Sequence, residues 1–184
     1  WEGEYHMGPM ASGDHSWIVN WLAGVFQGYC LRHDLGRFYG AFNIREPGSG
    51  DRNFRVPDAG LLSVDDGRRW SSGKKWLDEG CRVVVEVRSP DDETYDKFSF
   101  YAARGVGEVV VIDEVSLRIE GFRLAGRQLL AVGPDRDGWV ACEGLRARFI
   151  VRKDAQGRDR LVAHFDLDDR DEMLSDGLAS YTYD

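Results

Sequence analysis

Two carboxylates and two cations are ordered along this chain as a metal-dependent hydrolytic centre would require. Asp58 ends a Val-Pro-Asp sequence, Glu86 lies inside an apolar run at 82–87, and Arg88 and Lys97 follow it. Mg²⁺ binds through one or two carboxylates and keeps several waters, so Asp58 and Glu86 are candidate ligands. Lys97 and Arg88 are candidates for holding the attacking water and for stabilising charge on a phosphate. A carboxylate such as Glu86, if buried in a valine-rich strand, needs a partner or a metal.

The elements around these residues read as a βαβ unit. The nearly continuous apolar run at 82–87 is typical of a strand buried on both faces. Ser89 or Asp91 is expected to cap a helix that begins with Pro90 and acidic residues and ends at Gly105. Residues 108–112 form a second buried strand, which we expect to run parallel to the first.

The remaining pattern predicts an α/β (α+β) fold with a mixed sheet flanked by helices. Apolar residues recur at helical spacing over 15–33, with Ser12 or Asp14 as the cap. Residues 35–45 and 54–64 are expected to form two neighbouring strands. Further antiparallel strands are expected in the C-terminal third, at 116–124, 128–132 and 145–152, with a last strand near 161–167.

Length and charge indicate one domain followed by an acidic tail. The chain of 184 residues suits a single domain, which we place at 1–165, and its 42% hydrophobic and 30% charged residues are typical of a globular protein. Residues 166–184 carry a net charge of −6 out of the total of −8. The body is therefore nearly neutral, and the negative total argues only mildly against nucleic-acid binding. The tail is expected to be solvated.

Cysteine usage and hydropathy favour a reducing, cytoplasmic setting. Cys30, Cys81 and Cys142 are far apart and odd in number, which supports neither a disulfide framework nor a zinc site. No apolar run approaches the roughly 20 residues of a membrane span, so we expect no membrane association. The serine-hydrolase elbow, the zinc-protease His-Glu-x-x-His motif and the phosphate-binding loop are all missing from the sequence.

Several segments, in order and spacing, resemble the Uma2-like (DUF820) group of restriction-endonuclease relatives within the PD-(D/E)xK nuclease superfamily. The likeness spans roughly residues 1–130, and it rests on Gly3-Glu4-Tyr5 with Pro9 and His15, on Val56-Pro57-Asp58, on Val84-Val85-Glu86-Val87-Arg88-Ser89-Pro90, and on Asp96-Lys97 with Tyr101, Gly105-Val106 and the strand from Val109 to Asp113.

The resemblance implies a restriction-endonuclease-like core that uses Mg²⁺ or Mn²⁺ to cleave DNA. It implies that Asp58 and Glu86 bind the metal, and that Glu4 approaches it as an N-terminal acid. The superfamily lysine lies two residues after the strand acid, where this chain has Arg88. Arginine stays protonated and is a poor base. Lys97, one helix away, is then the implied substitute for that lysine.

Other residues have a structural interpretation beside the functional one. Tyr101 lies one helical turn after Lys97, a spacing also typical of a core aromatic. His15 suits capping or packing at the start of the first helix. The basic residues Arg68, Arg69, Lys74 and Lys75, interleaved with Trp70 and Trp76, can follow a phosphate backbone or form a solvated loop.

Three hypotheses follow. The first is a Mg²⁺-dependent endodeoxyribonuclease. The second is a catalytically degenerate nuclease fold that binds nucleic acid or protein, and it is motivated by Arg88 and by the negative charge. The third is a structural homo-oligomer that assembles through exposed antiparallel strands. A homodimer is also compatible with the first hypothesis.

Overall fold

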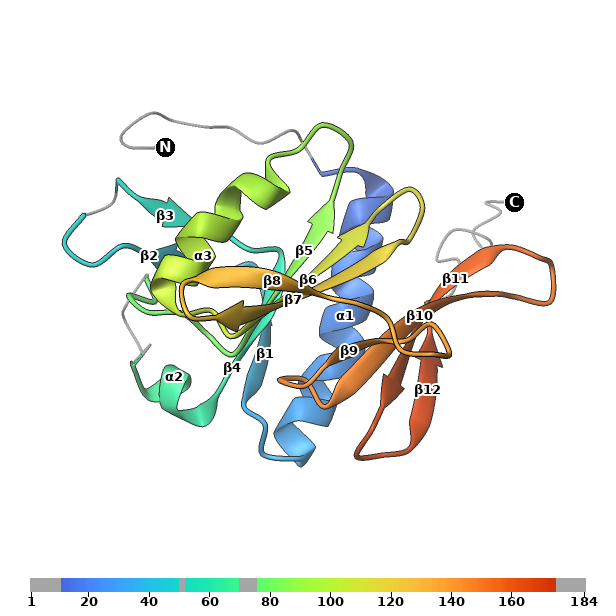
Figure 1. Cartoon of the computed structure of the whole chain (residues 1–184). Coiled ribbons are helices and arrows are strands. Elements are labelled where there is room, and N and C mark those ends of the chain that lie inside the picture. The colour runs from blue at the N-terminus through green and yellow to red at the C-terminus, as the bar shows by residue number, and fades with distance from the viewer. Residues whose placement is uncertain (1–10, 50–51, 70–75, 175–184) are drawn as a thin grey trace, which may run out of the picture.

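The computed structural model describes residues 11–49, 52–69 and 76–174, with the backbone alone at 67–69. Its largest sheet has six strands in the order β1-β4-β5-β6-β7-β8 (Figure 1). They are β1 (Arg37–Gly40), β4 (Ala59–Leu62), β5 (Val83–Arg88), β6 (Glu108–Asp113), β7 (Ile119–Ala125) and β8 (Gln128–Val132). β5 runs parallel to β6 and antiparallel to β4. The predicted mixed sheet and the parallel β5–β6 pair are therefore confirmed.

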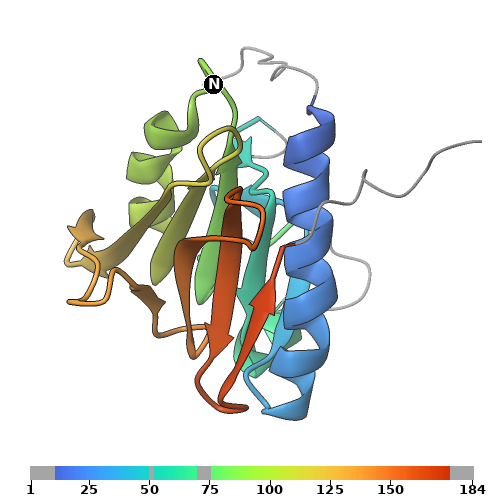
Figure 2. The same cartoon turned by 90° about the vertical axis from the view of Figure 1, so that its right-hand side faces the viewer.

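Helices lie on both faces of this sheet. α1 (Gly13–Arg32) covers one face, and the 3₁₀ turn η1 (Thr94–Lys97) with α3 (Phe98–Arg104) covers the other (Figure 2). Val83, Val85 and Val87 of β5 pack in the apolar cluster that contains α1. Val84 packs in the cluster that contains α3. Because side chains alternate along a strand, Glu86 and Arg88 belong to the α3 face.

Helix α1 forms where its apolar spacing predicted it. Its buried residues are Ile18, Leu22, Phe26, Tyr29 and Cys30. Ser12 is the N-cap, and its hydroxyl accepts a hydrogen bond from the His15 amide at 2.9 Å. This bond satisfies one of the amides that a helix start leaves without an intrahelical acceptor.

The strands predicted at 35–45 and 54–64 are each divided in two. β2 (Ile44–Arg45) pairs with β3 (Phe54–Arg55), and β1 pairs with β4. Pro57 lies between β3 and β4, where its missing amide hydrogen does not interrupt a ladder. The break leaves Asp58 immediately before β4. The short helix α2 (Val64–Arg69) follows that strand.

The helix after β5 begins later than its sequence predicted. The Asp92 carboxylate accepts hydrogen bonds from the amides of Ser89 and Thr94, both at 2.9 Å. Asp91 adopts a positive φ of 62°. These bonds hold the segment in a turn, so the expected caps Ser89 and Asp91 are wrong, and helical structure starts at Thr94. The predicted end is confirmed, since Gly105 caps α3 with a φ of 77°.

The antiparallel strands predicted at 116–124 and 128–132 are β7 and β8 of the large sheet. Those predicted at 145–152 and 161–167 belong to a second, antiparallel sheet. Its order is β12-β11-β10-β9, and its strands are β9 (Val140–Cys142), β10 (Ala147–Lys153), β11 (Asp159–Phe165) and β12 (Arg170–Met173). β12 falls within the segment expected to be an acidic tail. That segment instead continues the fold to Leu174, because β12 pairs with β11 and Leu174, 5% exposed, donates its amide to the Leu161 carbonyl at 2.8 Å.

A buried acid ties the two sheets together. Glu108 of β6 accepts hydrogen bonds from the Gly144 amide at 2.7 Å and from Arg123 Nε at 3.0 Å. Gly144 lies between β9 and β10, so this carboxylate fixes the second sheet against the first. In the described parts of the chain, none of the helices combines the length and the apolar character needed to cross a bilayer.

Candidate active site

Glu86 lies at the centre of a polar cluster on the α3 face of the large sheet. It is 1% exposed, and its neighbours Val85 and Val87 in β5 are apolar. Lys97 Nζ contacts Glu86 Oε2 at 2.7 Å, and the Tyr101 hydroxyl donates a hydrogen bond to Oε1. Each oxygen of this buried carboxylate therefore has a donor, as burial of a charge requires.

Lys97 and Tyr101 come from one continuous helical segment. Lys97 ends η1, and Tyr101 lies one turn later in α3. Residues four apart share a helix face, so both side chains point toward the sheet and contact Glu86. Burial raises the pKa of Tyr101 well above its usual value, and the charge of Glu86 raises it further. Tyr101 thus stays a neutral hydrogen-bond donor.

Asp58 is attached to the strand that carries Glu86. Its Oδ2 accepts a hydrogen bond from the Val87 amide at 2.7 Å, and Ala59 pairs with Val85 across β4 and β5. Its Oδ1 lies 3.3 Å from Nε2 of His15, near the start of α1. The loop before β4, the end of β5 and the first turn of α1 therefore meet at Asp58.

The charges of these groups are coupled. Burial raises the pKa of Glu86 to about 7; the charge of Asp58 also raises it, whereas Lys97 and the Tyr101 hydrogen bond lower it. The hydrogen bond to Asp58 raises the pKa of His15, burial opposes that shift, and the charges of Asp58, Glu114 and Glu86 add to the rise. Asp58 therefore affects the pKa of both Glu86 and His15.

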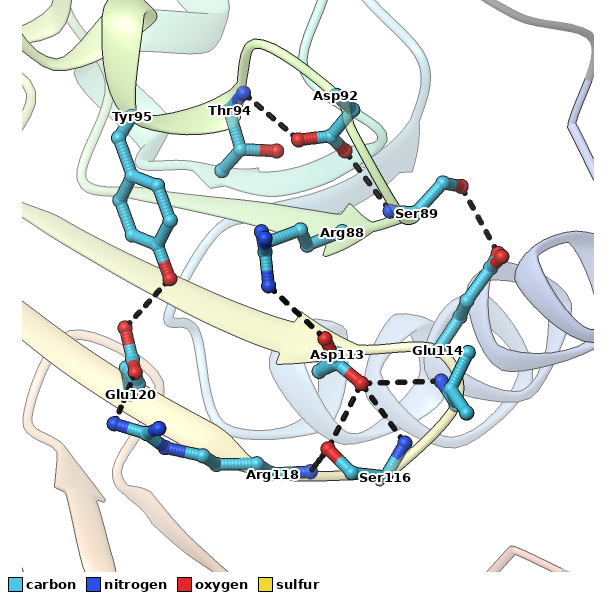
Figure 3. Close-up of polar contacts among 11 residues, drawn as sticks. Arg88, Ser89, Asp92, Thr94, Tyr95, Asp113, Glu114, Ser116, Arg118 and Glu120 are labelled. Atoms are coloured by element: carbon cyan, nitrogen blue, oxygen red, sulfur yellow. Dashed lines mark hydrogen bonds and ion pairs between the residues drawn. The ribbon is translucent and has the colours of Figure 1, made fainter.

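Arg88 shares the face of Glu86 but contacts other partners. Its Nη1 lies 3.1 Å from Asp113 Oδ2, and its guanidinium carbon lies 5.5 Å from the ring centre of Tyr95 (Figure 3). The pKa of Asp113 is lowered, and the hydrogen bond from the Ser116 amide is the largest cause. Tyr95 donates to Glu120 at 2.8 Å. Arg88 is therefore held at the ends of β5 and β6 by an acid and an aromatic ring.

The donor set suits a hard divalent cation. A cation bound by Asp58 and Glu86 would relieve the repulsion through which Asp58 raises the pKa of Glu86. Within residues 11–49, 52–69 and 76–174, no cluster of three or more His, Cys, Asp or Glu is arranged to hold a metal. Two carboxylates with water completing the shell is the arrangement that Mg²⁺ favours.

Some predicted residues cannot be placed in this site. Glu4, Lys74 and Lys75 lie outside the described residues, and of Arg68 and Arg69 only the backbone in α2 is described. Trp70 also lies outside that part. Trp76, in contrast, packs against Phe54 with ring centres 4.9 Å apart, next to Arg45.

Two contacts were not predicted from the sequence. The spacing of Tyr101 is typical of a core aromatic, and the residue is fully buried, but its hydroxyl also donates a hydrogen bond to Glu86. The position of His15 at the start of α1 suits a capping or packing residue, but its ring faces Asp58. The helical spacing of Tyr101 after Lys97 was a usable signal for the first contact. No local signal relates His15 to Asp58.

Comparisons with known proteins identify the family and the fold of this chain. The model of the Uma2 family, described as "Putative restriction endonuclease", matches residues 1–151. A solved structure of "a putative nuclease belonging to DUF820" from Anabaena variabilis is similar, with a TM-score of 0.64, 17% identity, and coverage of 79% of this chain and 80% of that one. At that identity the likeness shows a shared fold. A search of the curated proteins finds no match. The chain belongs to the Uma2 family.

Proposed function

We propose that this protein is a divalent-metal-dependent endodeoxyribonuclease whose centre is formed by Asp58, Glu86 and Lys97. The observation that supports it most is the buried Glu86 carboxylate, which has Lys97 on one oxygen and the charge of Asp58 nearby. A fully buried acid costs free energy to maintain unless it is paired. Family membership and the shared nuclease fold support the same function.

Asp58 and Glu86 would hold Mg²⁺ or Mn²⁺. The bound ion would neutralise charge on the phosphate and make an attacking water more acidic. Glu86 is suited to this role because it lies on strand β5 and is buried, where electrostatic interactions are stronger than in water. The Val87 amide holds one oxygen of Asp58 and so limits rotation of that carboxylate. Glu4 stays a predicted additional ligand.

Lys97 would orient the attacking water and stabilise the charge that develops on the phosphate. An ammonium group has three N–H donors. One contact of Lys97 goes to Glu86, so other donors can hold a water or a phosphate oxygen. The Lys97 side chain is 23% exposed, which leaves it accessible from solvent. Lys97 is the last residue of the 3₁₀ turn η1 and not part of a strand. Its side chain therefore reaches Glu86 from the α3 face of the sheet.

Arg88 would support a phosphate without taking a proton. An arginine guanidinium is a poor base and offers five donors. The contact with Asp113 fixes its position, and 34% of the side chain remains exposed for a further partner. Arg88 would contribute to phosphate binding, and Lys97 would contribute to the chemical step. We expect the contribution of Arg88 to the rate to be the smaller of the two.

DNA is the substrate that this chemistry implies. The three buried free cysteines suit a cytoplasmic setting. Arg68, Arg69, Lys74 and Lys75 stay predicted contacts to the DNA backbone. The homodimer likewise stays a prediction, which sedimentation of the full chain would test.

A plasmid assay tests the proposed function. The full chain is incubated with supercoiled DNA and Mg²⁺, Mn²⁺ or EDTA, and nicked and linear products are measured for the wild type and for Glu86→Ala. Cleavage by the wild type that requires metal and is lost in Glu86→Ala is expected. No cleavage with either ion, or equal cleavage by both proteins, would contradict the proposal. DNA binding without metal binding or cleavage would instead support the degenerate binding module.

A further inference from the structure

The first turn of α1 is fixed to the end of β5 by a bridge of three side chains. The Ser12 hydroxyl donates a hydrogen bond to Glu114 Oε2 at 2.9 Å, and the Ser89 hydroxyl donates to the same oxygen at 3.0 Å (Figure 3 shows the Ser89 contact). The Glu114 amide also donates to the Arg88 carbonyl at 3.0 Å. Ser12 is the N-cap of α1, so Glu114 joins the start of that helix to the strand of Glu86.

This bridge places His15 beside Asp58. The amide of His15 donates to the Ser12 hydroxyl, which positions the first turn. Its ring then reaches Asp58, with Nε2 at 3.3 Å from Oδ1. The His15 side chain is 14% exposed and that of Asp58 is 24% exposed, so protein atoms largely surround the pair.

Asp58 is thereby held from two sides. The Val87 amide occupies Oδ2 and His15 faces Oδ1. The terminal torsion of an aspartate is otherwise soft, with broad energy wells. Asp58 also lies in the loop before β4 and not within a strand. Two partners on different elements are therefore what determines the plane of its carboxylate.

We propose that His15 is a positioning residue that orients the Asp58 carboxylate, so that Asp58 and Glu86 can bind one divalent ion. It acts through Asp58 and does not touch the substrate, and the Ser12–Glu114–Ser89 bridge holds it in place. This inference rests on the proposed function. Groups that orient a metal ligand typically account for 10–100-fold in metal affinity or activity, and that is the size of effect expected here.

The test is Mn²⁺ binding by calorimetry, with plasmid cleavage measured in parallel, on the full chain. His15→Ala is expected to weaken Mn²⁺ affinity by about 10-fold or more. His15→Gln keeps a donor near the place of Nε2, so it is expected to recover most of that loss. Glu114→Gln, which weakens the bridge while leaving Asp58 and His15 intact, is expected to show a smaller loss of the same kind.

Asn20→Ala is the matched control, since Asn20 is an exposed residue of the same helix. It is expected to bind Mn²⁺ and cleave as the wild type does. If His15→Ala does not fold, Glu114→Gln still decides the question, because a metal affinity of Glu114→Gln equal to that of Asn20→Ala would overturn the inference. Failure of the proposed function is a different result, in which the wild type itself neither binds Mn²⁺ nor cleaves. Recovery of Mn²⁺ affinity in His15→Gln shows that the lost function is the hydrogen bond to Asp58. A role of His15 in folding alone would not require that donor.

Discussion

Lys97 Nζ lies 2.7 Å from Glu86 Oε2, so the cation that contacts the strand acid comes from a helical segment. Two residues after Glu86, where the superfamily pattern has lysine, Arg88 contacts Asp113 at 3.1 Å. Lys97 and Arg88 thus pair with different acids. This arrangement supports the proposal that Lys97 performs the role of the strand lysine.

Glu86 should make the metal-free protein less stable as the pH rises. Its pKa is raised from 4.5 to about 7 in the folded state, so folding retains a proton that the unfolded chain releases. The stabilisation is complete below pH 4.5 and is lost as the pH rises through about 7, and its full size is about 3 kcal/mol.

Glu86→Gln removes this titration and should flatten the profile over that interval. Urea unfolding in EDTA at several pH values measures the free energy of unfolding of both proteins. Parallel pH profiles for the wild type and the variant would contradict the assigned pKa shift.

Tyr101→Phe should destabilise the protein because it leaves one oxygen of buried Glu86 without its donor. The expected loss is about 1–3 kcal/mol in the free energy of unfolding near neutral pH. Tyr95→Phe is the control, since Tyr95 is 41% exposed and its hydroxyl contacts Glu120 at the surface. A loss of less than about 0.5 kcal/mol is expected there. Equal losses for the two variants in urea unfolding would show that the Glu86 contact has no special weight.

Gly60→Ala should disrupt the pairing of β4 with β5. A Cβ at Gly60 would lie 2.4 Å from the Val83 carbonyl oxygen and 3.0 Å from the Phe42 ring. The backbone has to move, so a loss of more than about 2 kcal/mol is expected. Gly40 of the adjacent β1 has nothing within 4 Å of such a Cβ, and Gly40→Ala should change stability little. Thermal unfolding of both variants distinguishes this contact from a general cost of alanine in the sheet.

The sequence was sufficient for the elements whose signals are local. The valine runs of β5 and β6 predicted buried strands, and the apolar spacing over 15–33 predicted α1. Glu86 stood out because a carboxylate in a buried strand demands a partner. Lys97 was a candidate because it is a cation close after the strand acid and because of the family resemblance, and the structure brings it to Glu86. The contact of Tyr101 with Glu86 was not predicted, although its spacing one turn after Lys97 allowed it.

The features that were not predicted from the sequence depend on contacts between distant segments or on side chains that compete with helix formation. Asp92 accepts bonds from two amides and so delays the helix to Thr94, although Pro90 and the acidic residues favoured an earlier start. The approach of His15 to Asp58 requires α1 to dock on the end of β5. The tail prediction counted charge, whereas Leu174 is buried and extends the fold.

The central claim is that Lys97, and not Arg88, supplies the essential cation. Cleavage of supercoiled plasmid by Lys97→Met and Arg88→Met, alongside the wild type at saturating Mg²⁺, tests it most directly. Loss of an electrostatic donor to the transition state costs about 100-fold or more, and that loss is predicted for Lys97→Met. A loss of less than about 10-fold is predicted for Arg88→Met. Wild-type rates in Lys97→Met, or a larger loss in Arg88→Met, would contradict the account.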